Sequence, residues 1–212
     1  MKNLCLVMTL LFLALGLGAC TVHGPLAIEP IAKGATAIPL NFTESLYRVD
    51  RDGTLYFYFS GTVADPVTSE PQTQIALIRM FWTPVGGRTS LNPTSLNASY
   101  RYIVATPNAV GMYEGAGFVR NADSPGESTL AARIVDGDLR LTEATANFVD
   151  QLGHARIRGT FKAHLNDALT LERMLDARRS FFARSLEISK MPATQPATQD
   201  ATQPATAPAT RP

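Results

Sequence analysis

Few side chains in this sequence are of the types that carry out chemistry. The chain has 212 residues and three histidines. His154 begins a predicted strand and His164 lies on its polar face, so that with a carboxylate they would form a metal site. No H-E-x-x-H motif and no His-x-His pair accompanies them, which favours an ordinary polar surface. We therefore expect no catalytic residue, no metal and no cofactor.

One carboxylate has unusual surroundings. Glu114 lies within "MYEGAGFV", where the other side chains are small or apolar. A buried carboxylate there would have a raised pKa and would be a candidate acid or ligand contact. An exposed position on an alternating strand is the simpler alternative. The stretch "DRDGT" (50–54) begins like a calcium loop but lacks its later acidic ligands, so it predicts a hairpin turn.

Aromatic residues offer a second kind of site. Together with Glu114, the possible ligand contacts are Tyr56, Tyr58, Trp82, Tyr100 and Tyr102, with Tyr113 nearby. If these rings line one face, they could bind an apolar or sugar ligand, because an aromatic ring offers a flat apolar body with a polar tip. The alternative is that they pack beneath a C-terminal helix as ordinary core.

The elements that would position these residues are strands. The predicted strands form a hairpin over 45–63 that turns at Asp52-Gly53, then 73–83, 98–106, 111–119, 129–135 and 138–149 joined across Asp136-Gly137, and 155–165. The apolar run 73–83 predicts a strand covered on both faces. A change of apolar parity within 138–149 predicts a bulge near Glu143, and the glycines at 111, 115 and 117 predict strong curvature or close packing.

The pattern over 155–165 indicates the fold class. Apolar and polar residues alternate strictly there, which is typical of an antiparallel sheet with one wet face. No helical segment separates the strands, so βαβ units are not expected. We predict an all-β fold, an antiparallel barrel or sandwich of about eight or nine strands with one C-terminal amphipathic helix.

That helix is predicted over 167–187, with Asn166 or Asp167 as its N-cap. Its apolar residues at helical spacing are Leu171, Met174, Leu175, Phe182 and Leu186. We expect this stripe to pack on the sheet or over an open barrel end.

The start of the chain carries a different kind of signal. Lys2 precedes a short apolar run, Leu4 to Leu17, and two small residues precede Cys20. The sequence Leu17-Gly18-Ala19-Cys20 resembles the lipobox of bacterial lipoproteins. The resemblance implies cleavage before Cys20, lipidation of Cys20 and a membrane-anchored place in the cell envelope. Thr21 rather than Asp follows, which under that family's sorting rule favours the outer membrane, facing the periplasm.

These signals divide the chain into four parts. Residues 1–19 are the predicted signal peptide, 20–34 a lipidated tether, 35–190 the β-rich domain and 191–212 a disordered tail rich in Pro, Ala, Thr and Gln. From the anchor and the tail, the expected partners are the membrane, an envelope protein or cell-wall polymer.

The balance of 19 basic and 18 acidic residues argues against a nucleic-acid partner. We expect a non-catalytic envelope lipoprotein, a structural or interaction module. One alternative is a β-barrel carrier of an apolar small ligand, which requires a lined cavity of several hundred Å3. The other is an envelope hydrolase, which requires side chains such as Glu114, His154 and His164 to converge in a cleft.

Overall fold

The computed structural model describes residues 25–32, 34–65, 69–84 and 96–190. The predicted signal peptide, Cys20 and the C-terminal tail lie outside the described residues. Within these ranges lie nine strands and one helix: β1 (Ala27–Pro30), β2 (Ile38–Pro39), β3 (Glu44–Val49), β4 (Leu55–Ala64), β5 (Pro71–Met80), β6 (Ala98–Ala105), β7 (Val110–Asn121), β8 (Thr129–Ala144), β9 (Ala155–Leu165) and α2 (Asp167–Lys190).

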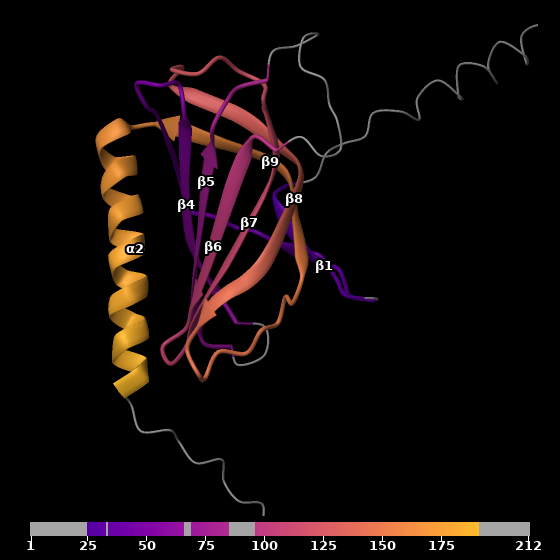
Figure 1. Ribbon diagram of the computed structural model, residues 1–212, viewed down its shortest axis with the longest axis vertical. Coiled ribbons are helices and arrows are strands. Elements are labelled where there is room, and N and C mark those ends of the chain that lie inside the picture. Colours follow the sequence, from indigo (N-terminus) through magenta and orange to yellow (C-terminus); the bar gives the residue numbers. More distant parts are fainter. Residues whose placement is uncertain (1–24, 33, 66–68, 85–95, 191–212) are drawn as a thin grey trace, which may run out of the picture.

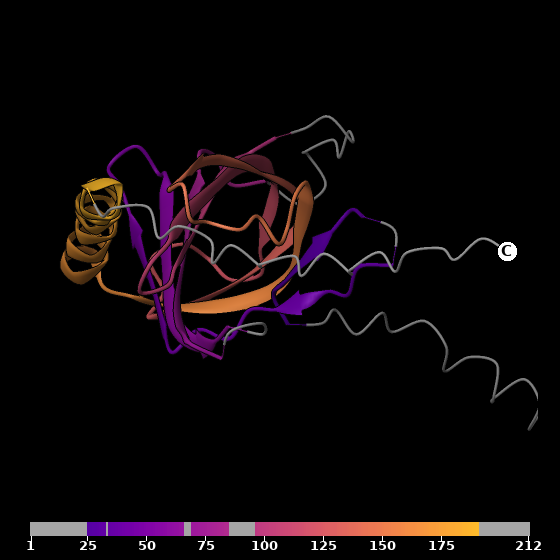
Figure 2. The same cartoon turned by 90° about the horizontal axis from the view of Figure 1, so that it is seen from below.

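The strands close into a barrel, which confirms the predicted fold class. Strands β3 to β9 pair in chain order as antiparallel neighbours, and β9 returns to β3 in a short parallel pairing at Leu46 and Tyr47. Strands β1 and β2 are additional, and β1 pairs with the outer edge of β9. Figure 2 shows the ring of strands end-on, with α2 and the β1–β2 pair on opposite sides of it.

The barrel interior is filled by aromatic and aliphatic side chains over much of its length. Phe161 packs edge-on against both Phe57 and Phe59, with ring centroids 5.1 Å apart in each case. Along β9 the inward residues from Ala155 to Ala163 are buried or half-buried while Arg156, Arg158 and their alternates face water. The alternation predicted for this strand is therefore confirmed.

Glycines allow the strands β7 and β8 to approach closely. A Cβ at Gly115 would overlap the carbonyl oxygen of Asp138, and one at Gly117 would overlap that of Asp136. The ring of Tyr100 also occupies the space beside Gly117. The close packing predicted for these glycines is confirmed, because any side chain at Gly115 or Gly117 would push the two strands apart.

The predicted hairpin turn at Asp136-Gly137 is wrong. β8 is one continuous strand that pairs with β7 on one edge and β9 on the other. Its ladders shift register at this point, so Asp136-Gly137 lies in a bulge that bends the strand around the barrel. An Asp-Gly pair occurs in both turns and bulges, because glycine tolerates unusual backbone geometry. The pairing of β8 on both of its edges shows that this one lies in a bulge. The bulge expected near Glu143 is confirmed by a second register shift, although the strand ends at Ala144 rather than at residue 149.

The first described residues belong to the barrel rather than to a free tether. Ala27–Pro30 pairs with β9, and both Leu26 and Ile28 are buried in the main core. The tether predicted over 20–34 is therefore wrong from Pro25 onward. Proline and glycine on both sides of this short strand hide its pattern, because too few residues alternate to reveal a strand.

Helix α2 packs on the outer face of the barrel, along β3 to β7 (Figure 1). Asn166 caps it, since its Oδ1 accepts a hydrogen bond from the Leu169 amide at 3.1 Å. The predicted buried stripe is largely wrong. Ala177, Phe181 and Ile188 are buried against the strands, whereas the exposed apolar residues of the helix are Leu171, Leu175, Phe182 and Leu186. The buried face of the helix, opposite the exposed leucines, carries the small residues Thr170 and Ala177. Their small size lets the helix lie close to the sheet.

The close approach of β7 and β8 gives a test of the fold. Gly117→Ala should lower the free energy of unfolding by about 1–3 kcal/mol, because the added methyl group meets backbone that cannot move freely. Ser99→Ala, on the outer face of β6, should change it by less than about 0.5 kcal/mol. Urea denaturation followed by the fluorescence of Trp82, the single tryptophan, measures both. Equal stabilities would contradict the assigned contact.

Candidate functional site

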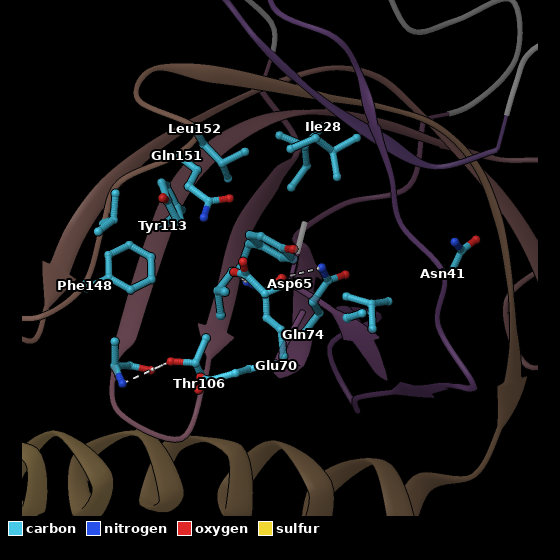
Figure 3. A pocket seen from close by; sticks show the side chains of 18 of the residues that line it. Ile28, Asn41, Asp65, Glu70, Gln74, Thr106, Tyr113, Phe148, Gln151 and Leu152 are labelled. Carbon is cyan, nitrogen blue, oxygen red and sulfur yellow. Dashed lines mark hydrogen bonds between the residues drawn. The ribbon is translucent and has the colours of Figure 1, made fainter. Parts of the chain in front are cut away.

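One end of the barrel is hollow. A cavity of about 360 Å3 opens where the β4–β5, β6–β7 and β8–β9 connections meet. Its lining includes Val104 from β6. Figure 3 shows Ile28 from β1 and Leu152 from the β8–β9 connection on the wall of the same cavity. Residues far apart in the sequence therefore enclose a single space.

The inner end of the cavity is aromatic. Tyr102 and Tyr113 face each other on neighbouring strands, with ring centroids 6.2 Å apart, and both are buried. Phe148 approaches Tyr113 edge-on at 6.2 Å. The Phe148 ring occupies the space that a side chain at Gly111 would need, so the glycine allows the aromatic wall to form.

A hydrogen-bonded loop forms one side of the mouth. The hydroxyl of Tyr113 donates to Oδ1 of Asp150 at 2.6 Å, and the same oxygen accepts from the Gly153 amide at 2.8 Å. Burial, followed by the bond to Asp150, raises the pKa of Tyr113 above its ordinary value of 10.0. The phenol therefore stays protonated at neutral pH and remains a donor to the loop.

A chain of polar side chains runs from the mouth toward the interior. Nε2 of Gln72 donates to Oδ2 of Asp65 at 3.2 Å, and Nε2 of Gln74 donates to Oε1 of Gln72 at 3.0 Å. All three residues are buried and line the cavity. They are polar groups held inside an otherwise mainly apolar wall, which is the usual composition of a small-molecule site.

The structure separates the aromatic residues singled out from the sequence. Tyr102 lines the cavity, and Tyr100 is buried in the barrel but does not reach the cavity wall. Tyr58 packs on the outside of the barrel beneath α2. Trp82 contacts Phe118, and the Trp82 residue is 38% exposed. Tyr56, also outside, lies between two cations.

Those cations are Arg48 and Arg79, each 5.6 Å from the centre of the Tyr56 ring. Outer and inner rings cannot contact one ligand, because the barrel wall lies between them.

The residues considered for acid–base or metal chemistry are also apart. Glu114 points outward from β7 and pairs with Arg101, whose Nε lies 2.7 Å from Oε1 of Glu114. His154 lies 3.3 Å from Asp138, and His164 contacts Thr129 at the other end of β9. Among the described residues, no group of three or more His, Cys, Asp and Glu side chains could hold a metal ion.

Sequence reasoning missed most of the cavity wall. Gln72 and Gln74 share parity with the inward residues Ala76 and Ile78 of β5, and that alternation was a usable signal. Phe148 and Leu152 follow the end of β8, where the chain has no period to reveal which side chains turn inward.

No family model, no curated protein and no solved structure matches this chain. Within the described ranges, no helix has both the length and the apolar character needed to cross a membrane.

The bond between Tyr113 and Asp150 is expected to order the mouth. Tyr113→Phe should make the amides of residues 148–153 exchange with solvent at least about tenfold faster, since a hydrogen bond to a charged group contributes about 1.5–3 kcal/mol. Hydrogen–deuterium exchange with mass spectrometry measures this. Tyr102→Phe removes a neighbouring hydroxyl that does not bind the loop and should leave these rates unchanged. Unaltered exchange in Tyr113→Phe would show that the loop is ordered by other contacts.

Proposed function

We propose that this protein is a lipid-anchored protein of the bacterial envelope whose barrel binds a small, mainly apolar molecule. The observation that carries the proposal is the cavity of about 360 Å3 inside a closed barrel. Small-molecule sites have volumes of about 300–1,000 Å3 and combine apolar walls with a few placed polar groups. The cavity has both properties.

The position of the cavity at the unfilled end of the barrel favours binding over a purely structural role. A barrel of this size has room either for its own side chains or for one small ligand. Here aromatic side chains fill one part of the interior, while the end beyond Tyr102 and Tyr113 stays open. A hydrolase is supported less well, because Glu114, His154 and His164 lie on different parts of the outer surface.

The anchor is supported by the resemblance of Leu17-Gly18-Ala19-Cys20 to the lipobox. Two or more acyl chains hold a protein stably on a bilayer, whereas one chain does so only marginally. A carrier of apolar molecules gains from such a position, since its ligands concentrate in or near membranes. The outer membrane, facing the periplasm, is the proposed location.

Lipidation is tested at the cysteine. Cys20→Ala should abolish incorporation of radiolabelled palmitate and leave the protein in the uncleaved form. Cys5→Ala, which changes the other cysteine within the apolar run, should still be labelled. Persistent labelling of Cys20→Ala would refute the anchor.

Ligand binding is tested by filling the cavity. Val104 points into it, so Val104→Trp should weaken binding of N-phenyl-1-naphthylamine, an apolar fluorescent dye, by at least about tenfold. Thr62→Trp adds the same ring at an exposed position on the outside of β4 and should bind the dye normally. Ala109→Trp, at the rim, replaces the first variant if that fails to fold. Dye binding that is equal in all variants would place the dye elsewhere and contradict the proposal.

A further inference from the structure

The polar chain in the cavity has a direction. Gln72 turns its NH2 group toward Asp65, because Nε2 of Gln72 donates a hydrogen bond to Oδ2 of that residue. The oxygen of Gln72 then faces the NH2 group of Gln74. The amide of Gln74, at the inner end of the chain, is thereby oriented with its oxygen left over.

That oxygen has no partner. Oε1 of Gln74 is buried and accepts no hydrogen bond, although the whole residue is only 4% exposed. A buried acceptor without a donor is unfavourable, and native proteins rarely retain one without a functional or structural reason. The hydroxyl of Tyr100 is buried without a partner as well, but Tyr100 does not line the cavity.

The cavity wall also limits the charge of a ligand. None of the described residues that line it is Lys, Arg or His. An anionic head group placed there would lose its water without gaining a cation, which is strongly unfavourable. Fatty acids and organic phosphates are therefore poor fits to this site.

We infer that the cavity selects an uncharged apolar molecule that carries a hydrogen-bond donor, a hydroxyl or amide N–H, and that the side chain of Gln74, which lines the cavity, turns its unpartnered Oε1 to accept that hydrogen bond. The apolar body of the molecule packs against Tyr102, Tyr113 and Phe148. The inference rests on the proposed function, because it assigns a chemical class to the ligand of the same cavity. Gln74 is the residue that sets the specificity.

Three probes of nearly the same shape separate the effect of a hydrogen-bond donor from the effect of charge. 2-Naphthol carries a donor, 2-methoxynaphthalene replaces it with an ether, and 2-naphthoate carries a negative charge. We expect 2-naphthol to bind about tenfold more tightly than 2-methoxynaphthalene, which is the effect of one buried hydrogen bond, and 2-naphthoate to bind weakest. Calorimetric titrations of the full protein measure the affinity for each of the three probes.

Two matched variants assign the effect to a side chain. Gln74→Met keeps a similar length but removes the acceptor, so it should bind 2-naphthol and 2-methoxynaphthalene equally. Asn108→Met removes an amide at an exposed position that does not line the cavity and should keep the tenfold preference. Circular dichroism checks that each variant is folded. The order of affinity of the three probes for the unmodified protein can be measured without either variant.

The outcomes distinguish the two proposals. A preference for 2-naphthol that disappears only in Gln74→Met supports the inference. Binding of all three probes with equal affinity, strongest binding of 2-naphthoate, or a preference that persists in Gln74→Met overturns the inference and leaves the cavity as a binding site. If no probe binds, both the inference and the proposed function fail.

Discussion

The whole structure depends on strand β9, because this strand closes the barrel. One of its edges pairs with β8, and the other is shared between β1 near Ala155 and β3 near Leu165. The pairings with β1 and β3 cover the two ends of this edge of β9, so closure leaves it no long unpaired stretch. The edge is divided because β3 diverges from β9 and β1 completes the wall. The segment Ala27–Pro30 is thus a structural part of the barrel.

The same closure explains why one end of the interior is full and the other hollow. Toward one end, the inward positions of β4 and β9 carry Phe57, Phe59 and Phe161, whose rings interlock. Toward the other, β4 and β7 place Gly61 and Gly111 inward. The backbone at Asn41 and the ring of Phe148 occupy the space beside these glycines instead of barrel side chains. These segments cover the opening incompletely, and the cavity is what they leave unfilled.

A structural feature was predictable from the sequence when it depends on residues that are neighbours in the chain. The alternation over 155–165 and the hairpin at Asp52-Gly53 depend on neighbours in sequence, and both were predicted correctly. The helix cap is also local, and the structure selects Asn166 from the two predicted candidates. Asp136-Gly137 and the helix stripe were not, because pairing on both edges and the closeness of α2 to the sheet are tertiary effects. The sequence also could not separate inner from outer aromatic residues without the register between strands. The cavity combines β1, β5 and the β8–β9 connection, so its wall exists only once the barrel is closed.

The chain enters the barrel early, and this would limit how far a domain anchored at Cys20 could stand from a membrane. Pro25 already bridges to Thr160 of β9, and it follows Cys20 by five residues. A fully extended chain of five residues spans at most about 18 Å. With a lipid on Cys20, the β9 wall would therefore stay within one short span of the head groups, and β1 would run from there toward the hollow end. Such a protein would exchange molecules with the bilayer surface beside it rather than search the space beyond.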